Sequence, residues 1–364
     1  MDGVNVFIAV QKVYYPLLCI MGIPANLFTF YMIRFRQCGM SKTATVYLSC
    51  LALMDTFYLV WVILLDLCLV FLQVEPFWHV QPWCGLMCFL QYGALYSSSW
   101  IVVMFTIERY LVLSITMGKQ RLHRACTALF ICVTVVLLSH IASVPMSWIN
   151  TVTPVNVTVD GQNVTMLRCH YREAKFTTIL VLVTTFLSGG IPIILVIIFN
   201  SLIVFHLSRS SQLFTKEERR VIRGARKRGV VRRTIILLGT VSASFVILSL
   251  PRFVTYCILR TEYNYTEFDR NDYGILINII SDVANMLQNL NSATNFLLYC
   301  MVSRSFRQEL ANTLTCQAKS KEVGSLLNQT TRSVKVFSVV DQKETLVIDP
   351  VHAVLTKLKR TEGS

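Results

Sequence analysis

Seven apolar runs, each long enough to cross a lipid bilayer, constrain the fold of this chain more than any other feature. A helix needs about 20 residues to span roughly 30 Å of hydrocarbon. Because lipid offers the backbone no hydrogen-bonding partner, helices rather than open strands are expected. The predicted fold is an all-α membrane protein with a seven-transmembrane helix bundle. The runs lie at Val13–Ile33, Ala44–Leu72, Phe89–Ile115, Ala125–Trp148, Thr177–Leu207, Val231–Leu259 and Gly274–Val302.

Composition supports a lipid environment and disfavours two other classes of protein. Of the 364 residues, 54% are hydrophobic and 15% are charged, with a mean hydropathy of +0.55. A soluble domain carries about 25% charged residues. An enzyme is disfavoured because the sequence has neither a His-Glu-x-x-His metal motif nor a glycine-rich phosphate loop. A transporter is disfavoured because no internal repeat is visible.

Basic residues between the runs predict the orientation, because short loops rich in Lys and Arg remain in the cytoplasm. Such loops follow the first, third and fifth runs, at Arg34, at Lys119 and between Lys216 and Arg233. We therefore expect a multi-pass plasma-membrane protein with a short extracellular N-terminus at residues 1–12. The net charge of +14 is interpreted as attraction to anionic membrane lipid and to cytoplasmic partners, not to nucleic acid.

Sequons and two cysteines fit this orientation. Asn156, Asn163 and Asn264 each begin an Asn-X-Thr sequon in a segment predicted to lie outside, where glycosylation takes place. Cys84 begins the third helix on the outer side, and Cys169 lies in the long outer loop. In an oxidising compartment these two can form a disulfide that ties the loop over the bundle. The alternative partner is Cys88, one turn deeper.

The C-terminal part has its own pattern. Residues 303–316 predict a short amphipathic helix on the membrane surface, with Phe306 and Leu310 facing lipid. Cys316 is a candidate palmitoylation site. Residues 317–364 are polar and mixed in charge and are expected to be disordered. Phosphorylation of their Ser and Thr residues makes arrestin an expected partner.

Motifs distributed over the helices are individually weak but specific in their order and spacing. The motifs are Gly22-Ile23-Pro24-Ala25-Asn26, Leu51-Ala52-Leu53-Met54-Asp55, Cys84, Glu108-Arg109-Tyr110, Pro192, Pro251, and Asn291 through Asn295 to Tyr299. Through these motifs the chain resembles, from about Val13 to Leu314, the rhodopsin-like (class A) G-protein-coupled receptors, which implies a heterotrimeric G protein as partner.

Within that family, helices six and seven suggest a closer resemblance. Leu250-Pro251-Arg252 and the stretch from Ser281 to Phe296 are similar to a small group of orphan receptors linked to aromatic amino acids and short peptides. Phe296 stands where most of the wider family has proline. Ser249 stands two residues before Pro251, where tryptophan is common, and the fourth run lacks the usual internal tryptophan. These departures place the family's side-chain toggle in doubt.

A carboxylate in mid-membrane requires a proton, a cation or polar neighbours. Asp55 is in this position, and the resemblance implies that Ser98, Asn291 and Asn295 surround it. Together these residues predict an oxygen-lined pocket of the size of a sodium ion, whose ligands suit a hard cation. The alternative is a hydrogen-bonded water network with no ion. No other cofactor is expected.

The triplet Glu108-Arg109-Tyr110 is expected to act as the coupling switch. Glu108 and Arg109 can pair at the inner boundary until a conformational change releases Arg109, and the resemblance implies that Arg109 then receives a G-protein helix. Tyr299 is expected to stabilise the open state. In the alternative interpretation the two charged side chains simply extend to the lipid headgroups.

The ligand is expected in the outer half of the bundle, between the helices. Arg252 lies in an apolar stretch and is predicted to hold a ligand carboxylate through two parallel hydrogen bonds. Its alternative role is an ion pair with Asp282 that clips two helices together. Asn285 lies in a neighbouring turn. Gln91 stands where amine receptors carry an aspartate, which disfavours a cationic monoamine.

Aromatic residues at helical spacing complete the predicted pocket, although such residues more often serve packing. Together they predict a small aromatic or acidic ligand, or a short peptide. A non-signalling scaffold or decoy receptor is the alternative function, and a transporter ranks below it. The aromatic candidates are Tyr92, Tyr96, Phe253 and Tyr256.

Overall fold

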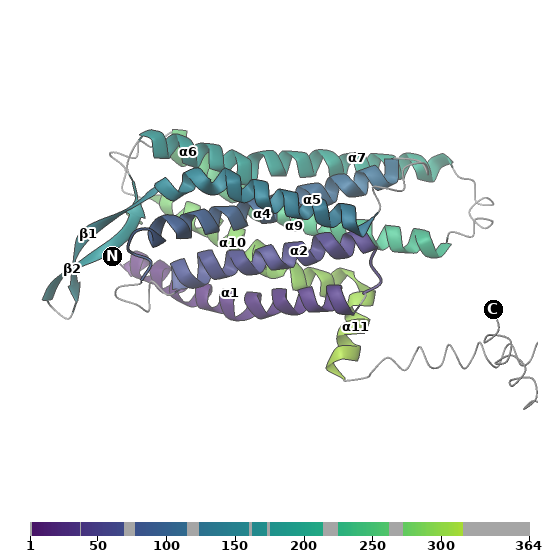
Figure 1. Ribbon diagram of the computed structural model, residues 1–364, viewed down its shortest axis with the longest axis horizontal. Helices are drawn as coiled ribbons and strands as arrows, with labels where there is room; N and C mark the ends of the chain where they lie inside the picture. The colour runs from purple at the N-terminus through teal and green to yellow at the C-terminus, as the bar shows by residue number, and fades with distance from the viewer. Residues whose placement is uncertain are drawn as a thin grey trace, which may run out of the picture. The chain divides into compact units, whose positions relative to one another are not determined.

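The computed structural model describes residues 2–36, 38–68, 77–114, 124–159, 162–172, 175–213, 225–261 and 272–315, in some places as backbone alone. Within these ranges the seven predicted runs form seven helical segments whose direction alternates along the bundle (Figure 1). The segments are α1 (Asp2–Phe35), α2 (Lys42–Tyr58) with η1 (Leu59–Cys68), α4 (Trp83–Ser114), α5 (Ala125–Ser143) with η3 (Val144–Trp148), α6 (Lys175–Thr185) with η4 (Phe186–Gly190) and α7 (Ile191–Leu213), α9 (Ala225–Thr261), and α10 (Leu276–Val302).

Six of these segments are long and apolar enough to cross a membrane: Phe7–Phe35, Lys42–Leu65, Trp83–Ser114, Ala125–Trp148, Phe176–Arg209 and Ile235–Thr261. The seventh, α10, has the length, with 27 residues, but is more polar. Its polar side chains are largely buried, among them Asn278, Asn289 and Asn295. They therefore face the interior of the bundle, as expected for polar groups in membrane helices.

The chain divides into two compact units, Met1–Leu310 and Ala311–Ser364. The first contains the whole bundle. The boundary falls within α11 (Arg304–Leu314), the predicted eighth helix. Of the second unit the structure describes residues 311–315, which complete the last turn of α11. Cys316 and the predicted disordered tail lie outside the described residues.

The long loop between η3 and α6 departs from a purely helical fold. It forms an antiparallel hairpin of β1 (Asn150–Val159) and β2 (Gln162–Tyr171), at the same end of the bundle as the N-terminus (Figure 1). Alternating Thr and Val residues in β1 favour a strand. Asn156 and Asn163 lie on the two strands, whereas Asn264 lies outside the described residues; glycosylation of all three stays a prediction.

A disulfide fastens this hairpin to the bundle. Cys169 of β2 is bonded to Cys84 in the first turn of α4, with the two Cα atoms 5.8 Å apart. The predicted pairing is therefore confirmed. The alternative partner, Cys88, is buried and forms no disulfide within the described residues.

The core at the opposite end of the bundle includes one side chain that was predicted to face lipid. Phe306 of α11 is fully buried, and its ring lies 5.8 Å from that of Tyr299 and 5.9 Å from that of Phe296, between centroids. Leu310 is partly buried against the same core. The lipid-facing prediction for Phe306 is wrong, because the bundle offers this ring aromatic partners that lipid does not.

The helix α1 begins eleven residues before the predicted run, at Asp2 rather than Val13. Its extension contacts the segment that leads into α10. The ring of Phe7 lies 5.4 Å from that of Tyr273, and Gln11 hydrogen bonds to Asp282. The N-terminal residues thus form part of the folded unit rather than a separate tail.

Candidate functional site

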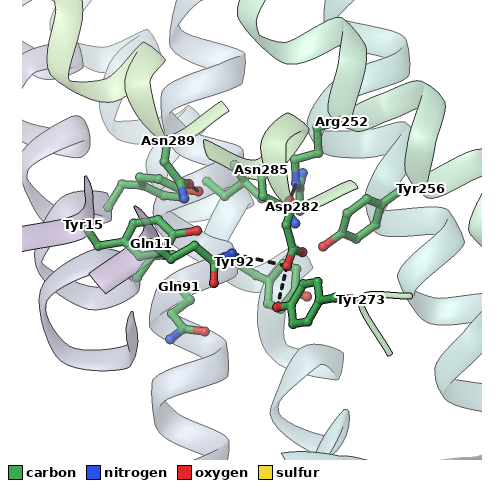
Figure 2. Close-up of a pocket in the computed structure, with 13 residues that line it drawn as sticks. Gln11, Tyr15, Gln91, Tyr92, Arg252, Tyr256, Tyr273, Asp282, Asn285 and Asn289 are labelled. Atoms are coloured by element: carbon green, nitrogen blue, oxygen red, sulfur yellow. Dashed lines mark hydrogen bonds between the residues drawn. The ribbon is translucent and has the colours of Figure 1, made fainter. Parts of the chain in front are cut away.

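A cavity of about 340 Å³ lies between the helices, with the side chains that line it drawn in Figure 2. Five helical segments and the turn before α10 contribute to its wall. The lining residues are Gln11 and Tyr15 from α1; Tyr58 from α2 and Val62 from η1; Gln91, Tyr92 and Leu95 from α4; Arg252 and Tyr256 from α9; Asp282, Asn285 and Asn289 from α10; and Tyr273.

Arg252 provides the cation of this cavity. Its Nε donates a hydrogen bond to Oδ1 of Asn285 at 3.0 Å, and its guanidinium carbon lies 4.6 Å from the ring centroid of Tyr256. The contact with Asn285 uses Nε, and the guanidinium also interacts with the side chain of Tyr256 by a hydrogen bond. Because an amide and an aromatic ring fix its orientation, the guanidinium is preorganised to bind a carboxylate through parallel hydrogen bonds.

Asp282 provides the anion, and its hydrogen bonds go elsewhere. Its Oδ2 accepts from the Tyr273 hydroxyl at 2.9 Å and from Nε2 of Gln11 at 3.3 Å, as the dashed lines of Figure 2 show. The described contact between Arg252 and α10 is therefore a hydrogen bond to Asn285, instead of the ion pair with Asp282 that was considered as the alternative. Asp282 serves instead to hold α1 and the turn before α10 over the cavity.

The floor of the cavity is polar as well. The Tyr58 hydroxyl donates to Oδ1 of Asn289 at 2.7 Å, which links α2 to α10. Gln91 donates from Nε2 to the carbonyl of Trp61 at 3.3 Å. Tyr58 and Asn289 were not predicted as site residues, although their helical spacing from predicted site residues was a signal. Tyr58 follows Asp55 by one helical turn, and Asn289 follows Asn285 by four residues, so each lies on a face already assigned to function.

Two predicted wall residues lie outside the described lining. Tyr96 donates its hydroxyl to Oγ1 of Thr184 at 2.8 Å, at the junction of α4 and α6. Phe253 packs edge to face on Phe186, with centroids 5.3 Å apart, beside Gly190 in the η4 turn. By contrast, Gln91, Tyr92, Arg252, Tyr256, Asp282 and Asn285 are brought together in one cavity.

Below this floor the predicted polar network surrounds Asp55. The carboxylate is 0% exposed; Oδ1 accepts from the Ser98 hydroxyl and Oδ2 from Nδ2 of Asn295, both at 2.6 Å. Three helices thus converge on one buried carboxylate. Asn291 is also buried, but the hydrogen bond described for it is from Thr294 to its backbone carbonyl.

At the far end of the bundle, Glu108 and Arg109 form the predicted ion pair. They are only 5% and 3% exposed, which contradicts the interpretation that they extend to lipid headgroups. Arg109 also donates to Oγ of Ser41 at 3.2 Å and to Oγ1 of Thr43. Ser41 caps the first turn of α2, so the guanidinium is fastened to the start of a neighbouring helix.

The two tyrosines of the predicted switch are packed rather than hydrogen bonded. Tyr299 is fully buried, and among the described residues its hydroxyl has no hydrogen-bond partner. The ring of Tyr110 lies 5.6 Å from that of Phe199 on α7. A buried hydroxyl without a partner is costly, and the role of Tyr299 in the switch stays a prediction.

Comparison with known proteins matches residues 25–299 to the family model described as 7 transmembrane receptor (rhodopsin family). Human G-protein coupled receptor 65 is 22% identical over 338 residues, which cover 90% of this chain and 95% of that protein. Mouse probable G-protein coupled receptor 142 is 27% identical over 67% of this chain and 60% of that protein. Rat proteinase-activated receptor 2 is 24% identical over 90% of this chain and 78% of that protein.

Proposed function

The chain belongs to the rhodopsin family of seven-transmembrane receptors, and on this premise we propose that it binds a small ligand or short peptide with an acidic end and an aromatic group. In this proposal the hairpin end faces the outside of the plasma membrane and the Arg109 end faces the cytoplasm. Ligand binding between the helices is transmitted to a heterotrimeric G protein at the Arg109 end.

The observation that carries the ligand proposal is Arg252 in the wall of the 340 Å³ cavity. A half-buried cation attracts an anionic group, and a planar guanidinium fits a carboxylate. Tyr92 and Tyr256 lie in the same wall and offer ring faces to an aromatic group. The volume lies near the lower end of the 300–1,000 Å³ typical of small-molecule sites. A compact ligand, or the end of a peptide, therefore fits better than a long peptide.

The switch proposal rests on the contacts of Arg109. Its bonds to Glu108, Ser41 and Thr43 hold it away from a partner. Outward movement of α9 opens a groove beside α4, and Arg109 exchanges these contacts for backbone carbonyls of a G-protein helix. Tyr299 moves with it and gains a polar partner for its buried hydroxyl. Phosphorylation of the C-terminal tail then favours arrestin over the G protein.

The network around Asp55 fits a sodium ion. A fully buried carboxylate with oxygen-bearing neighbours is a donor set that hard cations prefer. We infer that Asp55 and Ser98, with the side-chain oxygens of Asn291 and Asn295, hold the ion. When bound, it supplies the positive charge that makes a carboxylate tolerable at this depth.

The test is ligand-dependent nucleotide exchange by a purified G protein with the full-length receptor in lipid nanodiscs. Aromatic amino acids and short peptides are screened first. Once an agonist is found, Arg252→Gln should weaken its potency by about a hundredfold, because a charge-assisted bidentate contact contributes roughly 1.5–3 kcal/mol. Tyr96→Phe, outside the cavity, is the matched control. Unchanged potency in Arg252→Gln at normal expression would refute the carboxylate anchor.

A second variant separates signalling from binding. Arg109→Ala should abolish nucleotide exchange while agonist binding persists. If the wild-type receptor binds agonist but promotes no exchange with any class of G protein, the scaffold or decoy function is correct instead. One observation favours that alternative: Ser249, in place of tryptophan, is buried with a hydroxyl that has no partner among the described residues.

A further inference from the structure

A second cavity, of about 490 Å³, opens sideways toward the lipid between α4, α5 and η4. We call it the lateral pocket; α4 and α5 lie side by side along its length (Figure 1). Trp100 and Met104 of α4 form one wall, Thr134, Ser139 and Ala142 of α5 form another, and Leu187 of η4 closes the third. Tyr96, absent from the lining described for the central cavity, lies here as well.

The pocket lies within the hydrocarbon layer. Ser139 precedes the outer end of its segment, Trp148, by nine residues, or about 13 Å at 1.5 Å per residue. Thr134 follows the first residue of the segment, Ala125, by a similar length. Phe130 and Leu138 on the rim are 71% and 59% exposed in the isolated chain. The molecules that can reach the pocket are therefore those dissolved in the membrane.

Two hydroxyls in this apolar wall have no partner among the described residues. Ser139 is only 6% exposed and lines the pocket, and no hydrogen bond is described for its hydroxyl or for that of Thr134. Other hydroxyls on lipid-facing helices bond to their own backbone, as Ser201 does to the carbonyl of Ile197 at 2.8 Å. Lipid chains cannot satisfy such a group. A hydroxyl in the wall of an apolar cavity with no described protein partner indicates a ligand that supplies the missing hydrogen bond.

The depth of the two hydroxyls selects among membrane lipids. A phospholipid acyl chain carries no hydrogen-bonding group at this level. The single hydroxyl of cholesterol remains among the headgroups. A sterol with a second hydroxyl on its side chain combines a rigid apolar body with a polar group inside the hydrocarbon layer. We propose that the lateral pocket binds a side-chain-hydroxylated sterol, with its inner hydroxyl on Ser139 or Thr134 and its rings against Trp100.

The wall of the pocket is built to hold its shape. Nε1 of Trp100 donates to the carbonyl of Leu187 at 3.0 Å, within the η4 turn. The Tyr96 hydroxyl donates to Thr184 at 2.8 Å. These two bonds fix α4 to the fifth transmembrane segment one helical turn apart along the wall of the pocket. The pocket is thus preformed, which spares the ligand the cost of ordering its site.

Photolabelling tests this proposal without reference to signalling. Full-length receptor in phosphatidylcholine vesicles is exposed to a diazirine analogue of side-chain-hydroxylated cholesterol, and the adducts are mapped by mass spectrometry. We expect adducts on α4 and α5, displaced by unlabelled hydroxylated sterol at concentrations about tenfold lower than those of cholesterol, the worth of one hydrogen bond. Labelling that cholesterol or excess phospholipid prevents equally well would overturn the proposal, as would adducts confined to the central cavity.

Matched variants localise the site. Ser139→Ala should weaken labelling by about tenfold, and Ala142→Phe should fill the opening and abolish it. Ser201→Ala, whose hydroxyl already has a partner, and Val133→Phe, on the lipid face of α5 outside the described lining, should leave labelling unchanged. Each variant is compared at equal thermal stability. Unchanged labelling of Ser139→Ala together with Thr134→Val excludes a hydroxyl-anchored sterol, whatever the G-protein assay shows.

Discussion

Gly93 lies where α4 and α5 approach most tightly, and its replacement gives a prediction with a built-in control. A Cβ added at residue 93 would lie 2.6 Å from Cδ2 and 2.7 Å from Nε2 of His140. The ring is not free to turn away. Its Nδ1 donates to the carbonyl of Val136 at 2.8 Å, and the ring packs on Phe89 with centroids 5.6 Å apart. Gly93→Ala must therefore displace the ring or separate the helices.

Gly239→Ala on α9 is the matched control, because a Cβ there meets no atom within 4 Å. Both substitutions remove a glycine from a helix and gain up to about 1 kcal/mol in helix propensity. This gain cancels in the comparison. Overpacking costs about 1–3 kcal/mol, and the lost His140 hydrogen bond adds about 1 kcal/mol. Gly93→Ala should thus be less stable than Gly239→Ala by about 2–4 kcal/mol.

The assay is thermal denaturation of the purified protein in one detergent, followed with a thiol-reactive dye that reports exposure of buried cysteines. We expect the apparent Tm of Gly93→Ala to fall several degrees below the wild-type value and that of Gly239→Ala to equal or exceed it. An apparent Tm of Gly93→Ala at or above that of Gly239→Ala would show that α4 and α5 do not meet as described.

Three further perturbations address the switch, the hairpin and the polar network. Thr43→Ala removes one contact of Arg109 and should raise ligand-free nucleotide exchange severalfold; an unchanged basal rate would mean that this contact does not restrain the switch. Cys169→Ser opens a disulfide that closes a sequence separation of 85 residues, worth about 4–5 kcal/mol by loop entropy, and should reduce surface expression, as measured by flow cytometry. Asp55→Asn should abolish the rise in apparent Tm that sodium chloride gives relative to choline chloride; a persistent sodium-specific rise would place the ion elsewhere.

The transmembrane helices were predictable because lipid leaves the backbone a single way to satisfy its hydrogen bonds. The seventh run was marked despite its asparagines, and the structure shows why such residues are tolerated: they face inward. The hairpin was not predicted, although the alternation Thr151-Val152-Thr153 is a strand signal. The η4 turn was not predicted, and the close approach of Phe253 to Gly190 within it comes from tertiary packing that periodicity does not reveal.

The candidate site was predictable where chemistry and helix position agreed. Arg252 and Asp282 are charged residues in apolar segments, and such residues indicate function. Their partners were not predictable in the same way. Gln11 reaches Asp282 from 271 positions away in the sequence, and no periodicity connects residues that far apart. Tyr273 reaches it from the turn before α10. Tyr96 illustrates a different limit. Helical spacing predicts the face of the helix on which a residue lies, but it does not predict which of two cavities that face lines.

The buried amides of α10 bear on how the chain enters the membrane during synthesis. A segment that carries several asparagines partitions poorly into lipid as an isolated helix. Its amides become tolerable in lipid once Tyr58, Asp55 and Arg252 are present as their hydrogen-bond partners. The last span therefore depends on its predecessors, and a nascent chain halted before residue 276 leaves Asp55 and Arg252 without these partners. Such a shortened chain holds these polar groups in hydrocarbon without the amides that pair with them in the complete bundle.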